Sequence, residues 1–204
     1  MTTDLLFGSL ALSLLHAAIP NHWLPIVAIG KKAGWTAAKA SRITLLAGSA
    51  HALSTVLIGL LVSIAGWQLS ALATTFMETA APVLLLTLGA VFIWRHYYHR
   101  HFHLHGVLPE QLPEKQLIAA LAAAMFFSPC LEIGAFFLLA GTHGPWAVFN
   151  LSVLYTVSTV GGMVVWVQLV WHGLKLANWH TLEHYAGIIS GVVLMLAGII
   201  GLLH

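Results

Sequence analysis

The fold class of this chain is decided by residues 5–30, which read LLFGSLALSLLHAAIPNHWLPIVAIG and contain no Asp, Glu, Lys or Arg. A transmembrane helix needs about 20 mostly apolar residues to cross the hydrocarbon core of a bilayer. The stretch is long enough to do so, and Pro20 in its middle predicts a break in the helix. Because residues 1–4 carry no basic side chain, we expect the stretch to stay in the protein as a span and not to be cleaved as a signal peptide.

The composition of the whole chain indicates the same class. Of 204 residues, 59% are hydrophobic and 7% are charged, against about 25% charged in a typical soluble domain. So few charges do not cover the surface of a soluble globule, and disordered chains are poor in apolar residues. The net charge of +2 comes from scattered Lys and Arg, which excludes a phosphate-binding stripe, and the one cysteine, Cys130, excludes an internal disulfide. We therefore expect an integral membrane protein.

Six segments are long and apolar enough to be spans, so the sequence predicts an all-α membrane protein with six transmembrane helices. They cover approximately residues 5–30, 43–66, 79–98, 116–140, 146–171 and 185–204. The polar stretch between the third and the fourth is predicted to be a loop, because it contains Pro109 and Pro113. The expected domains are a first three-helix repeat over 1–98, a His-rich cytoplasmic linker over 99–115 and a second three-helix repeat over 116–204.

The basic residues set the expected orientation, because Lys and Arg are retained on the cytoplasmic side of a membrane. With six spans, all 8 Lys and Arg residues fall after the first, third or fifth span. Asp4 and Glu78 fall on the other side. We therefore expect a protein of the cell (cytoplasmic) membrane with its N- and C-termini outside.

Two recurring features indicate that the chain is built from two related halves. Residues 54–56, Ser-Thr-Val in the second span, recur as residues 158–160 in the fifth, and Pro20 in the first span has a counterpart in Pro129 in the fourth. Because each half has three spans, the second half crosses the membrane in the opposite sense. The pattern favours two inverted three-helix repeats with broken first helices, as in many secondary transporters. Chance is the alternative, since these residues are common in apolar helices.

Ionisable side chains inside a span are costly and are therefore functional candidates. Four stand out, His16, His22, His51 and Glu132. No Lys or Arg lies deep in a span to pair with Glu132, so a cation or a proton has to balance its charge. On an unbroken helix His16 and His22 would point about 120° apart, so the break at Pro20 is needed to bring them together. Three imidazoles and one carboxylate suit Ni, Co or Zn, and not Mg or Ca.

Further polar residues are predicted to lie beside this site or along the path to it. His51, Ser54 and Thr55 share one helix face, and the corresponding residues of the fifth span repeat that face. For any single histidine a helix-packing hydrogen bond is the competing interpretation, and Cys130 has simple packing as its alternative. The second-shell or pathway candidates are Asn21, Ser54, Thr55, Cys130, Tyr155, Ser158 and Thr159.

A second group of histidines lies between the two halves. A His-rich tract is a compositional signal for metal binding, and the position of this one predicts that it captures metal on the cytoplasmic side. The competing interpretation is a solvated loop whose aromatic residues lie among the lipid headgroups. The predicted metal-capture loop contains His96, His99, His101, His103 and His105.

The motifs resemble those of the nickel/cobalt transporter and efflux family, within the lysine-exporter-type superfamily of six-span carriers. Residues 16–22, His-Ala-Ala-Ile-Pro-Asn-His, resemble its H-A-x-x-x-x-H signature, and residues 50–56 look like its G-H-S-T-V motif in the second span. Residues 126–133 resemble a later motif that ends in Thr-Glu-Ile. A His-rich cytoplasmic loop between the halves is similar to the efflux branch. The resemblance implies a small inverted-repeat carrier of nickel or cobalt.

We therefore expect a secondary transporter that moves a divalent transition-metal cation such as Ni, Co or Zn, in the outward direction. His16, His22, His51 and Glu132 are expected to coordinate the ion at the midplane. Glu132 is expected to bind metal and proton in turn, which would couple the two fluxes. The expected partners are membrane lipid and the metal ion, with a homodimer left open and no nucleic acid. No catalytic residue is predicted.

Two other functions stay open on the sequence alone. One is a carrier of an organic or anionic solute on the same fold, because helix N-termini after Pro20 and Pro129 could hold a negative group. The other is a histidine-rich metalloenzyme that resembles the membrane di-iron desaturases and hydroxylases, which would leave the intramembrane residues without a role. Its histidines, all predicted on the cytoplasmic side, would be His96, His99, His101, His103, His105, His172, His180 and His184.

Overall fold

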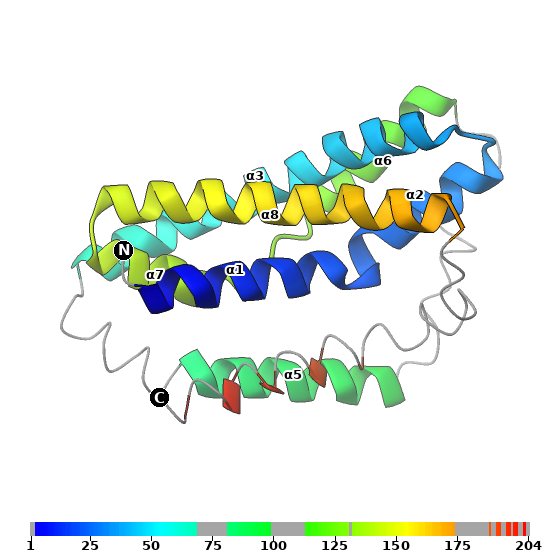
Figure 1. Ribbon diagram of the computed structural model, residues 1–204. Helices are drawn as coiled ribbons and strands as arrows, with labels where there is room; N and C mark the ends of the chain where they lie inside the picture. Colours follow the sequence, from blue (N-terminus) through cyan, green and yellow to red (C-terminus); the bar gives the residue numbers. More distant parts are fainter. Residues whose placement is uncertain are drawn as a thin grey trace.

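The computed structural model describes residues 3–68, 81–98, 113–130 and 132–173, together with residues 188, 191–192, 195–196, 198–199 and 202. Its elements are helices, in agreement with the all-α prediction (Figure 1). The sixth predicted span, 185–204, and most of the predicted metal-capture loop lie outside the described residues. The helices are α1 Thr3–Ala18, α2 Pro20–Lys32, α3 Ala37–Gln68, α5 Ala81–Tyr98, α6 Glu114–Phe126, α7 Gly134–Thr142 and α8 Pro145–Trp171.

Three helical stretches are long and apolar enough to cross a membrane, by length and composition. They are Leu5–Lys32, which contains α1 and α2, Ala37–Gln68 and Pro145–Trp171. These stretches include the first, second and fifth predicted spans. Large apolar side chains such as Leu61 on α3 and Val157 on α8 are exposed, as expected of surfaces that contact lipid. The count of six, the inverted repeat and the division at residues 98 and 115 stay predictions.

Two helical stretches are interrupted at prolines. Between α1 and α2, Ile19 has an extended backbone with φ −66° and ψ 128°. Pro20 occupies the first turn of α2, where its missing N–H removes no helical hydrogen bond. Between α6 and α7, Pro129 lies in a non-helical segment. Each interruption leaves main-chain groups and neighbouring side chains free to face the middle of the bundle.

The central element of the described bundle is α3, which packs against α6, α7 and α8 and also contacts α2. Helix α8 lies beside both α1 and α3, and Figure 1 shows α5 apart from these three helices. The α3–α7 crossing is close enough to require glycine, since a Cβ on Gly141 would lie 2.2 Å from the main-chain oxygen of Ser63. The Ser63 hydroxyl donates to the carbonyl oxygen of Phe137 over 2.9 Å. These contacts hold α7 against the C-terminal part of α3, and with it the α6–α7 break.

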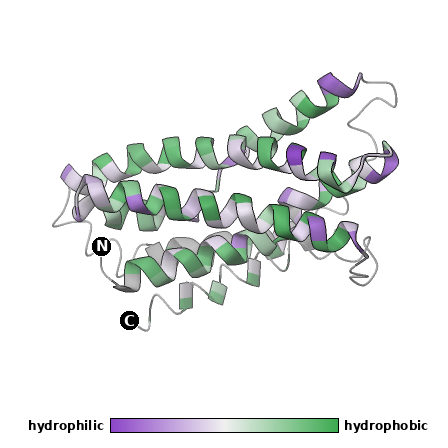
Figure 2. Cartoon of the chain, turned by 45° about the horizontal axis from the view of Figure 1, so that its top comes forward, coloured by the Kyte–Doolittle hydropathy of each residue, from purple (hydrophilic) through white to green (hydrophobic). Residues whose placement is uncertain are grey.

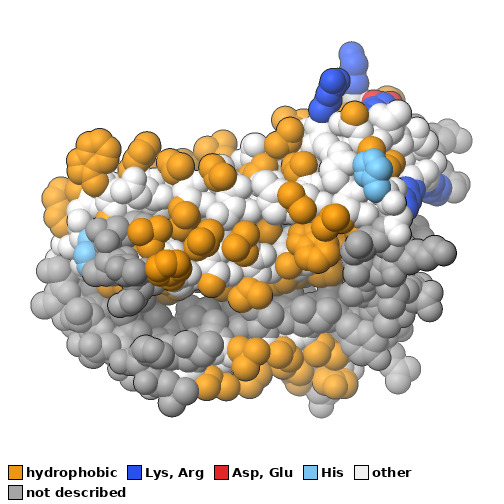
Figure 3. Space-filling view, in the orientation of Figure 1, with side chains coloured by type: hydrophobic (Ala, Val, Ile, Leu, Met, Phe, Trp, Pro, Cys, Tyr) orange, Lys and Arg blue, Asp and Glu red, His pale blue; other side chains and the backbone are white. Residues whose placement is uncertain are grey.

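The basic side chains gather at one end of the bundle, while hydrophobic side chains cover its length (Figure 3). Figure 2 likewise shows hydrophilic residues concentrated near helix ends. Lys31 and Lys32 end α2, and Lys39 near the start of α3 forms an ion pair of 2.7 Å with Glu114 at the start of α6. The basic residues of α2, α3 and α6 therefore share one end, which is what a one-sided distribution of Lys and Arg requires.

Candidate metal centre

The break between α1 and α2 brings two histidines together. His16 lies in the last turn of α1 and His22 in the first turn of α2. An unbroken helix would separate these side chains by about 120°. With Ile19 extended between them, their ring centroids lie 4.5 Å apart. The break at Pro20 therefore brings the His16 and His22 imidazoles together, as the sequence predicts.

A third imidazole comes from the middle of α3. The Nε2 atom of His51 lies 3.2 Å from the Nε2 atom of His16. The His51 ring is nearly parallel to the ring of His16, with centroids 5.4 Å apart, and its centroid is 4.6 Å from that of His22. Taking one nitrogen atom from each of the three rings, all three atoms lie within 4.8 Å of one another. We call these three residues the imidazole cluster.

Glu132 lies on the other edge of the His16 ring. Its Oε2 atom is 3.3 Å from Nδ1 of His16, and the Sγ atom of Cys130 is 3.5 Å from the same nitrogen. The structure thus brings the four predicted ligands together, but Glu132 and the imidazole cluster approach His16 from opposite sides. The carboxylate occupies the position from which it accepts the Nδ1 proton and orients the ring.

Two hydroxyl groups of the predicted second shell contact this centre. The Tyr155 hydroxyl lies 3.2 Å from Nε2 of His51. The hydroxyl of Thr55 accepts a hydrogen bond of 2.9 Å from the main-chain N–H of Cys130, which ties the α6–α7 break to α3. Ser54 donates to the carbonyl oxygen of His51 over 2.9 Å, within its own helix. Tyr155 and Thr55 therefore position site residues, whereas Ser54 stabilises local backbone.

The remaining predicted residues are described by their positions in the helices and not by contacts with the imidazole cluster. Thr159 is buried and lies beside the Tyr155 hydroxyl. Ser158 is half-buried, one helix position away. Asn21 belongs to α2, and His96 to α5, but their side chains lie outside the described part of the structure. The other predicted metal-capture histidines, His99, His101, His103 and His105, lie outside the described residues, as do His180 and His184.

The centre is deeply buried. His51 and Tyr155 have no exposed surface, and the side chain of Glu132 is 15% exposed. Apolar residues pack next to it, among them Ile133 just before α7, Phe137 of α7 and Leu151 of α8. In such surroundings an unbalanced carboxylate is costly, and a bound cation is one way to balance it.

The nitrogen positions also favour a cation. When His16 donates its Nδ1 proton to Glu132, its Nε2 presents a lone pair toward Nε2 of His51. The Tyr155 hydroxyl lies at hydrogen-bond distance from that same His51 nitrogen. The two Nε2 atoms lie 3.2 Å apart, which is a hydrogen-bond distance when one of the rings carries the proton, and a cation between them would take the place of that proton and of the Tyr155 contact. Nitrogen ligands at about 2.0–2.1 Å around a tetrahedral zinc ion lie about 3.3–3.4 Å apart. The observed spacing is close to that value.

Sequence reasoning gave no role to two stacked tryptophans, one of which directly follows His22. Trp23, directly after His22, stacks on Trp166 of α8 with ring centroids 5.8 Å apart. Trp23 is fully buried, in a cluster with Val27 and Val167. A signal was present, because both residues fall inside predicted spans and not at the span ends where tryptophan usually lies.

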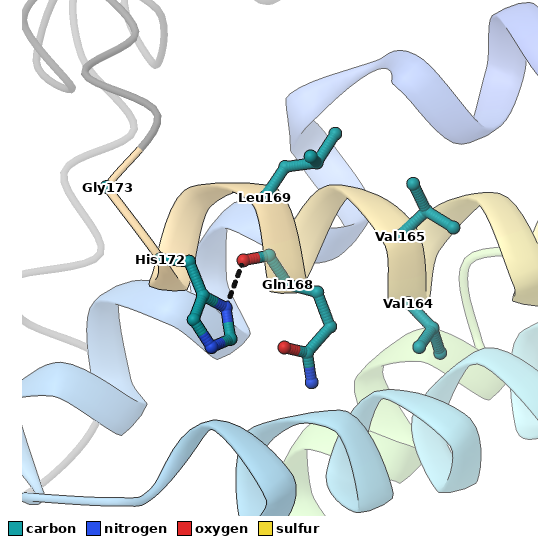
Figure 4. A pocket seen from close by; sticks show the side chains of 6 residues that line it. All are labelled: Val164, Val165, Gln168, Leu169, His172 and Gly173. Carbon is teal, nitrogen blue, oxygen red and sulfur yellow. Dashed lines mark hydrogen bonds between the residues drawn. The ribbon is translucent and has the colours of Figure 1, made fainter.

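A separate cavity of about 580 Å³ lies at the end of α8 (Figure 4). Figure 4 shows the hydrogen bond in which Nδ1 of His172 donates to the carbonyl oxygen of Gln168, over 2.9 Å. The cavity shares no residue with the imidazole cluster and contains no second ionisable side chain among those that line it. Its lining residues are Val164, Val165, Gln168, Leu169, His172 and Gly173.

No family model, no curated protein and no solved structure matches this chain. The chemistry of the centre therefore rests on its own residues: three imidazoles, a carboxylate, a thiol and a phenol, which come from two helix breaks and from the interiors of α3 and α8.

Proposed function

We propose that this protein is a secondary carrier that moves a divalent transition-metal cation, such as Zn, Ni or Co, across a membrane. The observation that carries the proposal is the 3.2 Å approach of the His16 and His51 Nε2 atoms, with His22 beside both, between helices long and apolar enough to span a bilayer. Imidazole nitrogens at this spacing suit a borderline transition metal.

Charge supports a cationic substrate over an anionic one. Glu132 is the one acidic residue that the described structure places in the centre, whereas Lys31 and Lys32 lie at the end of α2 and Lys39 lies near the start of α3. An anion here would meet the Glu132 carboxylate, whose partner is the His16 imidazole and not a Lys or Arg side chain. The helix N-terminus at Pro20, which the anionic-solute interpretation uses, is occupied by the His22 side chain facing His16.

The helix breaks support movement of the ion over permanent storage. Ligands on α1 and α2 are joined by a single extended residue, Ile19, and Cys130 and Glu132 lie in the non-helical segment between α6 and α7. A change of main-chain angles at either break would shift ligands without unfolding a helix. Broken helices that meet at a buried site are the arrangement that carriers with inverted repeats use.

In this conformation His16, His51 and Tyr155 are buried, and His22 and Glu132 are partly buried. On the side where α2 continues toward its basic end, Trp23 follows His22 directly and stacks on Trp166 of α8. Toward the other end the centre is covered by an apolar cluster that includes Leu5, Leu12 and Leu151. A carrier that alternates access passes through such a closed state, so we interpret the conformation as occluded, with the Trp23–Trp166 pair as the gate on the basic side.

Transport by the purified protein in liposomes tests the proposal. With a metal-sensitive dye inside the vesicles, wild-type protein is expected to admit Zn²⁺, Ni²⁺ or Co²⁺ faster than empty vesicles. His22→Gln removes one imidazole from a half-buried position and is expected to reduce metal affinity at least about tenfold. His172→Gln is the matched control, because His172 is exposed and remote from the cluster.

Two results would overturn the proposal. One is wild-type protein that is folded, yet binds none of the three ions and moves none of them. The other is purified protein that holds iron and forms an oxygen-dependent product, which would favour the metalloenzyme. Equal loss of transport in His22→Gln and His172→Gln would also contradict the site, because only the first substitution touches the imidazole cluster.

A further inference from the structure

The donor atoms on the Nδ1 side of His16 have the spacing of metal ligands in their own right. Sγ of Cys130 is 3.5 Å from Nδ1 of His16 and 3.7 Å from Oε2 of Glu132. The Nδ1 atom of His16 and the Oε2 atom of Glu132 are 3.3 Å apart. Around a tetrahedral zinc ion with ordinary bond lengths, a sulfur lies about 3.6 Å from a nitrogen or oxygen ligand, and nitrogen and oxygen lie about 3.4 Å apart. The triangle thus has the three edges that a tetrahedral ion would require.

We propose that His16, Cys130 and Glu132 form a second binding position, for a thiophilic divalent cation such as Zn²⁺ or Cd²⁺, next to the position formed by the imidazole cluster. The inference rests on the proposed function and specifies its substrate class. A thiolate and a carboxylate together neutralise a divalent ion, and thiolate ligands select for soft and borderline metals over Mg²⁺ and Ca²⁺. The three neutral imidazoles on the other side offer no such charge.

The second position is held in place by packing. Cys130 is buried, and its main-chain N–H donates to the Thr55 hydroxyl over 2.9 Å. Ile133, next in the chain after Glu132, is buried against α7 and α8 residues. The thiol and carboxylate therefore sit on a segment that is fixed to α3 at one end and to the apolar core at the other.

The two positions share one ring and exclude each other. A neutral imidazole has one lone pair, on either Nδ1 or Nε2. An ion in the second position uses Nδ1 of His16, and an ion in the imidazole cluster uses Nε2. One chain is therefore expected to hold one ion at a time, and an ion that changes position passes from one edge of the His16 ring to the other. Occupation of the second position requires the Cys130 thiol to lose its proton.

Cobalt is a suitable probe, because Co²⁺ bound to a thiolate gives an intense near-ultraviolet charge-transfer absorption that imidazole ligands do not give. The full chain in detergent, titrated with Co²⁺, is expected to show this absorption at one ion per chain. Cys130→Ser is expected to lose it and to bind Cd²⁺ at least about tenfold more weakly. His22→Gln, outside the second position, is expected to keep it.

Alkylation provides a second measurement that needs no variant. Cys130 is the one cysteine in the chain, so a thiol reagent labels this position alone. Cd²⁺ is expected to slow the labelling, while Mg²⁺ is expected to leave its rate unchanged.

The failure of this inference is distinguishable from the failure of the proposed function. Wild-type protein that binds Co²⁺ without the thiolate absorption, together with Cys130→Ser protein that binds Cd²⁺ as tightly as wild type, would overturn the second position and leave the carrier standing. Two Co²⁺ ions per chain would overturn the exclusion. Wild-type protein that binds neither ion would overturn the proposed function as well.

Discussion

Glu132 meets His16 at Nδ1, 3.3 Å away, and thereby leaves Nε2 of the same ring to face His51. This relationship gives the carboxylate a definite task when the ion sits in the imidazole cluster: it accepts the Nδ1 proton and fixes the ring so that the lone pair on Nε2 points inward. Partners of this kind are typical of histidines that bind metals.

Two substitutions of Glu132 separate orientation from charge. Glu132→Gln keeps an oxygen that can accept the His16 proton but loses the negative charge, and Glu132→Ala loses both. We expect metal affinity to fall about 10–100-fold in Glu132→Ala and less in Glu132→Gln. Calorimetric titration with Zn²⁺ measures the order. Equal affinities in wild type and Glu132→Ala would contradict the role of the carboxylate.

Tyr155→Phe tests the hydrogen bond to the third imidazole. The substitution removes the hydroxyl that lies 3.2 Å from Nε2 of His51 and keeps the ring that fills the core. Because the hydroxyl bonds the same nitrogen that faces His16, an ion on that nitrogen has to displace it, so we expect Zn²⁺ to bind more tightly in Tyr155→Phe. Tyr97→Phe, on an exposed tyrosine of α5, is the control and is expected to bind as wild type does. A larger effect in the control than in Tyr155→Phe would remove Tyr155 from the centre.

The composition and the apolar stretches were enough to predict an all-α fold with helices of membrane-spanning length, because charge content and segment length are sequence properties. The grouping of His22, His51 and Glu132 around His16 could also be predicted, because Pro20 marked the helix break and few other ionisable residues lay inside spans. The side of the ring from which Glu132 approaches was not predictable. It depends on how α7 packs on α3, where the contact between Gly141 and Ser63 sets the distance.

Cys130 and the tryptophan pair show where sequence reasoning underestimated residues. A single cysteine in an apolar segment is most often a packing residue, and only the fold shows that its sulfur lies 3.5 Å from His16. Trp23 and Trp166 come from α2 and α8, which are far apart in the sequence, so their stacking follows from the contact between these helices.

The proline break itself is open to a matched test. In Pro20→Ala the chain is free to continue α1 into α2, which would turn His22 about 120° away from His16. We expect Zn²⁺ affinity to fall at least about tenfold while thermal stability in detergent is kept or raised, because alanine favours a helix. Pro25→Ala is the control, since Pro25 also lies in α2 but contributes no break between ligands. The two variants are compared by metal titration and by thermal unfolding. If both bound Zn²⁺ as wild type does, the break would have no part in the site.

At the α3–α7 contact, we expect even a small increase in side-chain size to destabilise the protein. In Gly141→Ala the new methyl group would lie 2.2 Å from the main-chain oxygen of Ser63, and main chain moves only at a cost. Overpacking of this kind destabilises by about 1–3 kcal/mol. Gly161→Ala is the matched control, because a Cβ on Gly161 would have no neighbour within 4 Å. Thermal unfolding in detergent should therefore show a lower midpoint for Gly141→Ala and an unchanged or higher one for Gly161→Ala.

Because α7 holds the segment that contains Cys130 and Glu132, we also expect Gly141→Ala to weaken Cd²⁺ binding, and Gly161→Ala to leave it intact. A stable Gly141→Ala protein with normal Cd²⁺ affinity would show that the crossing does not fix the donor atoms around His16.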